Sequence, residues 1–100
     1  MLSMQDENMT QEREAAILEK AVETFGEKAH IVTAISSMSD LQNALVRTLA
    51  GYPDKACLLA NIAKVCMAMD ILQLIYGDAV EQELEQLEEL SQFMEELEKK

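Results

Sequence analysis

The stretch KACLLANIAKVCMAMDILQLIY, residues 55–76, decides the fold of this 100-residue chain. Its only charged residues are Lys55, Lys64 and Asp70, and apolar side chains recur at helical spacing on more than one side. A helix that is apolar nearly all round has to be buried nearly all round. A chain this short offers little to cover it, because small domains bury only a modest core. We therefore predict an oligomer; a central helix in a compact monomeric bundle is the alternative.

Helical periodicity continues on both sides of this stretch. Glycines mark where two of the predicted helices end, since glycine readily adopts the left-handed conformation that stops a helix. The sequence predicts an all-α chain with a flexible N-terminus at residues 1–9 and a single helical domain at residues 10–100. Four helices are predicted: 10–25 with Thr10 as its N-cap, 27–49 after Gly26, 55–76 after a turn at residues 51–54, and 79–97 after Gly77 and Asp78.

Net charge limits the partners of the chain. The formal charge is −11, which excludes a basic nucleic-acid surface and disfavours binding to anionic membranes. Cys57 and Cys66 are nine residues apart in one predicted helix, too far for a disulfide, and we expect two buried, reduced thiols. Together with the absence of a signal-like apolar run near the start, this predicts a cytoplasmic protein.

Two segments resemble a known family. FGEKAHIVTAISSMSDLQNAL, residues 25–45, is similar to the second helix of the MazG-like all-α nucleoside triphosphate pyrophosphohydrolases, in particular the short phage and bacterial members. LLANIAKVCMAMDILQLIYG, residues 58–77, is similar to their third helix, and the resemblance covers about residues 15–97. The fold that we expect is therefore a four-helix MazG-like bundle, dimerised through its second and third helices.

The family resemblance implies a metal site. Family members carry two adjacent glutamates followed by x-x-Glu on one helix and Glu-x-x-Asp on the next, and residues three apart share a helix face. Such a carboxylate cluster holds Mg²⁺, which prefers oxygen ligands and activates water for attack on a nucleotide. In this sequence only one of the corresponding positions keeps its carboxylate, and they are occupied by Ser36, Ser37, Asp40, Asn61 and Lys64.

These replacements predict a vestigial site with no catalytic and no metal-ligating residue. Serine and asparagine do not neutralise a divalent cation, and Lys64 places a positive charge where the cation would lie. We expect a catalytically inactive MazG-like protein, without cofactor, that serves as a binding or regulatory module. One hypothesis pairs Lys64 with Asp40 across the old pocket; in the alternative, Lys64 extends to solvent. His30, the only histidine, lies near the start of the second predicted helix and is interpreted as an exposed or N-terminal helical residue rather than a catalyst.

Two other functions are compatible with the sequence. The first is an active Mg²⁺-dependent pyrophosphohydrolase with a non-standard site that recruits Glu27, Asp70 or an acid from a partner subunit. The second is an acidic inhibitor or interaction protein of a mobile element of the phage type, which presents the Glu-rich face of residues 79–97 to a basic protein surface. The partners expected are a second copy in a homodimer or higher homo-oligomer and a protein with a basic surface; nucleic acid and membrane are not expected.

Overall fold

The computed structural model describes the backbone of residues 4–99 and the side chains of residues 11–99. Within this part of the chain every regular element is a helix: α1 at Met4–Leu49, α2 at Lys55–Tyr76 and α3 at Val80–Glu98. The prediction of an all-α chain is confirmed. The abundance of Leu, Ala, Met, Glu and Gln explains it, because these residues lose little side-chain freedom in a helix.

The first two predicted helices form the two halves of α1. Gly26 interrupts the helix with φ 83° and ψ 163°, a conformation that costs a glycine nothing. The N-terminal half begins at Met4, earlier than the start predicted at Thr10, because the polar residues before Thr10 continue the helical backbone. Residues 1–3 of the segment predicted to be flexible lie outside the described residues, so its flexibility stays a prediction.

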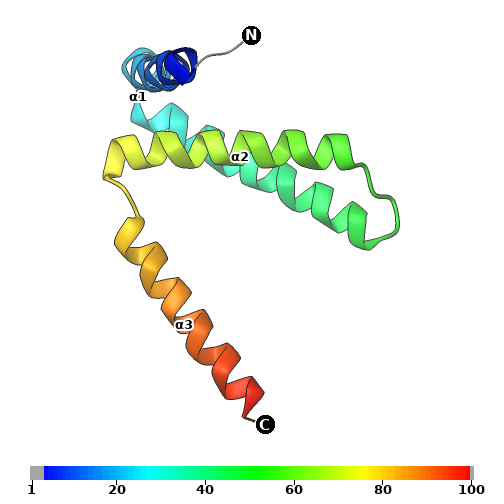
Figure 1. Cartoon of the computed structure of the whole chain (residues 1–100). Helices are drawn as coiled ribbons and strands as arrows, with labels where there is room; N and C mark the ends of the chain where they lie inside the picture. Colours follow the sequence, from blue (N-terminus) through cyan, green and yellow to red (C-terminus); the bar gives the residue numbers. More distant parts are fainter. Residues whose placement is uncertain (1–3, 100) are drawn as a thin grey trace.

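The second half of α1 and α2 form an antiparallel hairpin, as Figure 1 shows. The chain reverses at Gly51, which has φ 94°, and the Tyr52 amide donates to the Arg47 carbonyl at 2.9 Å. Asp54 is the N-cap of α2, and its side chain accepts a hydrogen bond from the Cys57 amide at 3.0 Å. The turn predicted at residues 51–54 and the helix predicted at residues 55–76 are therefore confirmed, and of Pro53 and Asp54, either of which could open this helix, Asp54 is the cap.

The core of the hairpin is small. Ala34 on α1 is 2% exposed, and Ala68 and Ile71 on α2 are the other buried apolar residues among the described side chains. Alanines at the contact let the two helix backbones approach closely. Most large apolar side chains nevertheless stay exposed on both helices, among them Val32, Ile35, Leu45, Leu49, Leu59, Met67 and Leu74.

Helix α3 stands apart from the hairpin (Figure 1) and makes no helix–helix contact within the described chain. Gly77, with φ 104°, ends α2 as the sequence predicts. The expectation that Asp78 caps the last helix is wrong by one residue: Ala79 is the N-cap of α3, without a side-chain cap, and the Asp78 carboxylate accepts a hydrogen bond from the Val80 amide at 3.2 Å. The radius of gyration is 17.6 Å, against about 13 Å for a compact domain of 100 residues. A single chain thus leaves its helices only partly packed.

Helix α2 is also long and apolar enough, by length and composition alone, to cross a membrane. Its most apolar 18-residue window has a mean hydropathy of 1.7, and little of that window is buried within the chain. A helix with these properties needs a cover, which is either lipid or protein.

Candidate functional site

The five positions that the family resemblance marks as a vestigial site converge only in part. Ser37 from α1 and Lys64 from α2 line one hollow of about 250 Å³ at the contact between the two helices. Ser37 is 9% exposed, whereas Lys64 is exposed to solvent. The other lining residues are His30, Thr33, Met67, Ala68 and Ile71.

The remaining three positions do not line this hollow. Ser36 and Asp40 are exposed on α1. Asn61 is half-buried, and its amide donates to the Cys57 carbonyl at 3.0 Å and contacts the Cys57 sulfur at 3.5 Å. The Asn61 amide is therefore used to hold a neighbouring turn of its own helix rather than to meet Ser37.

The hypothesised Asp40–Lys64 pair is not formed. Between these two described residues the structure contains neither a hydrogen bond nor an ion pair, and both side chains are exposed. Exposure is the physical reason, because a solvated ammonium and carboxylate gain little from pairing at a protein surface. The alternative, in which the Lys64 stem lies along apolar surface and its charge reaches water, agrees with this arrangement.

The residues of the hollow do not fit a divalent metal. Its polar lining consists of two hydroxyls, an imidazole and the Lys64 ammonium, with no carboxylate. Across the described side chains, no three His, Cys, Asp or Glu residues lie close enough together to hold a metal ion. Mg²⁺ dehydrates reluctantly without carboxylate ligands, so no step through a metal follows from this geometry.

His30 fits one of the two interpretations made from the sequence. It lies near the start of the second half of α1, but it is not exposed: its side chain is 9% exposed and its Nε2 lies 2.9 Å from the Ala21 carbonyl oxygen. Because a carbonyl oxygen only accepts, Nε2 carries the proton in this hydrogen bond. The ring also packs edge-on against Phe25, with ring centroids 6.2 Å apart. His30 thus ties together the two halves of α1 across Gly26.

The cysteines also differ from expectation. The sequence predicts two buried thiols, but Cys57 is only half-buried and Cys66 is exposed, and both are free. The reason is that one side of α2 has no cover in the single chain. Cys66 lines an open hollow of about 440 Å³ between the N-terminal half of α1 and α2, together with Glu14, Ile17, Leu18, Ala63, Met67 and Asp70.

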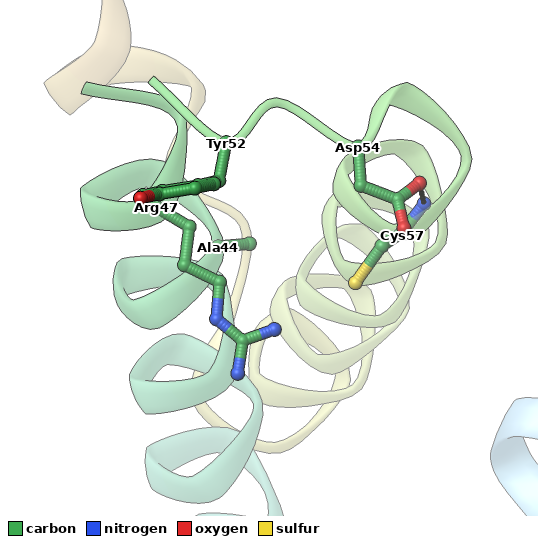
Figure 2. Close-up of a pocket in the computed structure, with 5 residues that line it drawn as sticks. All are labelled: Ala44, Arg47, Tyr52, Asp54 and Cys57. Atoms are coloured by element: carbon green, nitrogen blue, oxygen red, sulfur yellow. Dashed lines mark hydrogen bonds between the residues drawn. The ribbon is translucent and has the colours of Figure 1, made fainter. Parts of the chain in front are cut away.

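The acids named for a relocated metal site are dispersed. Glu27 accepts a hydrogen bond from the Tyr76 hydroxyl at 2.7 Å, and Asp70 lies in the 440 Å³ hollow. A further hollow, of about 370 Å³, lies below the turn between α1 and α2. Figure 2 shows Arg47 and Tyr52 on its α1 side, and Asp54 and Cys57 on its α2 side. None of the five vestigial residues lines this hollow.

The Tyr76–Glu27 contact gives a testable prediction. The hydrogen bond to the Glu27 carboxylate raises the pKa of Tyr76 above its ordinary value of 10.0, since ionisation of the phenol loses the bond and places two negative charges together. Glu27→Gln is expected to lower that pKa. An ultraviolet pH titration in a Tyr52→Phe background, where Tyr76 is the only tyrosine, measures the change.

The direction of the pH effect on folding follows from the same contact. A raised phenol pKa means that this contact contributes stability below pH 10 and loses it as the pH rises through the folded-state pKa. Titration curves that coincide with and without Glu27→Gln would show that the contact is not made in solution.

Comparison with known proteins adds no family assignment. No protein-family model, curated protein or solved structure matches the chain. The fold and the site define an all-α chain in which a helical hairpin carries an open, carboxylate-free hollow and a separate acidic helix.

Proposed function

We propose that the chain is a catalytically inactive, MazG-like helical protein that acts as a binding or regulatory module in the cytoplasm. In this proposal the second half of α1 and helix α2 form a homodimer or higher homo-oligomer, which completes a four-helix bundle. The chain uses no metal and no cofactor. The alternative of a Mg²⁺-dependent pyrophosphohydrolase has no support in the placement of Glu27 and Asp70, which lie in different surroundings.

One observation carries the inactive-site part of the proposal: Ser37 and Lys64 face the same hollow at the helix contact. The family resemblance places a carboxylate at each of these positions. A lysine ammonium about 4 Å from a cation would cost several kcal/mol per unit of cation charge at the effective dielectric typical of proteins. The hollow therefore favours a neutral or anionic group over a divalent cation.

The surface area of the chain supports the assembly part. The accessible surface is 8639 Å² for a mass of 11.2 kDa, whereas a compact monomer of this mass exposes about 5,700 Å². The excess is larger than one partner's share of a standard protein interface, about 800 Å². Exposed apolar residues on the hairpin, such as Ile35 and Leu59, are what a second copy would cover.

Charges within α2 favour a protein cover over lipid. Lys64 and Asp70 lie in the interior of the helix, and ionisable groups near the centre of a bilayer cost about 2.5 kcal/mol or more each. In an oligomer, Lys64 and Asp70 can both lie at the edge of the contact between the copies. This supports a water-soluble assembly.

Melting curves with and without metal test the inactive site. The wild-type chain is expected to show no change in melting temperature when Mg²⁺ or Mn²⁺ is added, because a ligand stabilises a protein only by binding its folded state. Light scattering on the same sample is expected to give a multiple of the 11.2 kDa chain mass. A metal-dependent rise in melting temperature would contradict the inactive site, and a monomer mass would contradict the assembly.

One observation favours a second candidate function. Helix α3 carries eight glutamates and no Lys or Arg between Val80 and Glu98, and it touches neither α1 nor α2. An acidic interaction protein of the phage-inhibitor type would present this surface to a basic partner. Such a complex would weaken steeply as salt is added, because exposed charge pairs are screened.

A further inference from the structure

The apolar side of α3 is uncovered along the whole length of the helix. Its large apolar side chains are between 53% and 60% exposed, and no other helix of the described chain contacts them. Positions 80, 83, 87, 90, 94 and 97 follow one another at alternating steps of three and four residues, which is the spacing of a helix–helix seam. We call these six positions the α3 seam: Val80, Glu83, Leu87, Leu90, Met94 and Leu97.

The charges of α3 are arranged around this seam rather than along it. The positions that border the seam within the helix are Leu84, Ser91 and Glu98 on one side and Gln86 and Phe93 on the other, so their only charge is Glu98, at the last residue of the helix. Within the seam itself the only charge is Glu83, in the first turn. The glutamates on the outer side of the helix are Glu81, Glu85, Glu88, Glu89, Glu95 and Glu96.

This arrangement points to a second copy of the same helix as the occupant. A basic partner would need acidic residues at the bordering positions, where interhelical ion pairs form, and the borders of α3 offer almost none. A second α3 meets a mostly apolar seam whose borders carry one charge, Glu98, and six of its eight glutamates face away. The remaining repulsion between the outer faces is screened within about 10 Å at 0.1 M salt.

Glu83 selects the orientation of the pair. In a parallel pair Glu83 would lie opposite Glu83 of the second copy. In an antiparallel pair, with the two-fold axis midway between residues 88 and 89, Glu83 lies opposite Met94. In the same register Val80 lies opposite Leu97 and Leu87 lies opposite Leu90. All pairs of facing seam residues except Glu83–Met94 are therefore apolar. We propose that α3 forms an antiparallel two-helix contact with α3 of a second copy in this register.

Such a contact is isologous, as in most homodimers, because each helix offers the same surface to the other. It is separate from the contact proposed for α1 and α2, and it does not depend on that contact or on the state of the vestigial site. Where both form, one chain has two distinct surfaces for its own copies.

Disulfide trapping tests the register in the full-length chain. Cys57→Ala and Cys66→Ala remove the native thiols, and then one chain carries Val80→Cys and another Leu97→Cys. The two chains are mixed in denaturant, refolded together and oxidised. The antiparallel register predicts the mixed 80–97 disulfide, because these side chains face each other across the axis.

A matched control uses the outer face of α3. In the proposed register, residues 81 and 96 lie at the same level along the two helices, just as residues 80 and 97 do. Chains with Glu81→Cys and Glu96→Cys, however, carry their thiols away from the seam, and they are expected to give little disulfide. Formation of 80–80 and 97–97 disulfides would overturn the antiparallel orientation. Failure of all seam cysteines to cross-link, or cross-linking of the outer-face pair to the same extent, would overturn the contact itself.

Association measurements test the same contact without cysteines. Leu87→Asp is expected to raise the dissociation constant of the α3 contact about 100-fold or more, because each dimer loses two buried leucines. Because α3 contacts no other helix of the chain, circular dichroism should show α1 and α2 unchanged. Glu83→Leu is expected to lower the dissociation constant at least about tenfold.

Sedimentation equilibrium in low and high salt completes the test. The α3 contact should strengthen as salt screens the outer glutamates. Association that is unaffected by Leu87→Asp and Glu83→Leu, or that weakens with salt, would overturn the proposal. If the chain still cross-links through α3 but shows no other association, the α3 contact is supported. The separate contact proposed for α1 and α2 is then contradicted.

Discussion

Placing carboxylates at the positions that the family resemblance marks is expected to create a Mg²⁺ site on the hairpin. The variant carries Ser36→Glu, Ser37→Glu, Asn61→Glu and Lys64→Asp, and it keeps Asp40. Ser37 and Lys64 already share one hollow, so their replacements would bring two carboxylates together. At a Mg²⁺ concentration of 100 times Kd the gain is about 2.7 kcal/mol. That corresponds to a rise in melting temperature on the order of 10 °C, measured by circular dichroism.

The control is Lys64→Ala alone, which removes the positive charge without adding ligands and should leave the melting temperature independent of Mg²⁺. Without metal, the restored variant should melt below the wild type, because its carboxylates repel one another. A variant with these carboxylates that folds but shows no change in melting temperature with Mg²⁺ would mean that the positions do not form one site. The metal site that the family resemblance implies would then be contradicted.

Placing a carboxylate at the centre of the helix contact is expected to unfold the hairpin. Ala34 is the most buried of the described core residues, at 2% exposed. Ala34→Asp buries a charge with no partner and separates α1 from α2. We expect a loss of about 3 kcal/mol or more in the free energy of unfolding, measured by urea denaturation followed by circular dichroism.

Ala29→Asp is the matched control, since Ala29 lies on the same half of α1 but is exposed. It should change stability by less than about 0.5 kcal/mol, as surface substitutions usually do. Equal effects of the two variants would contradict the contact between α1 and α2 at Ala34.

Local features of this fold were predictable from the sequence because they depend on one or two residues. Gly26, Gly51 and Gly77 take positive φ where the helices break or end, and glycine favours that conformation whatever surrounds it. The Asp54 cap likewise depends only on a short polar side chain next to a free helix N-terminus.

Features that depend on packing were predicted less well. His30 is buried because Gly26 turns the first half of α1 so that the Ala21 carbonyl meets the imidazole. A signal for its burial was present, since His30, Ala34 and Ser37 follow one another at steps of four and three and share a helix face. Cys66 is exposed because a side of α2 that is apolar in sequence has no neighbour within one chain.

The candidate site was likewise predicted only in part from the sequence. The family resemblance paired the positions of Ser37 and Lys64, and the structure places both residues at one hollow. The proposed Asp40–Lys64 pair failed because spacing does not determine exposure, and both side chains reach solvent. The position of α3 was outside the reach of the sequence pattern, since an amphipathic helix requires an apolar partner without specifying which one.

Turnover of nucleotides is the most direct test of the proposal that this hairpin no longer performs chemistry. The wild-type chain is incubated with a panel of nucleoside triphosphates and Mg²⁺ or Mn²⁺, and monophosphate and pyrophosphate are quantified against an Asp40→Asn chain. We predict that neither chain releases monophosphate or pyrophosphate above background and that the two chains do not differ. Metal-dependent pyrophosphate release that Asp40→Asn abolishes would contradict it.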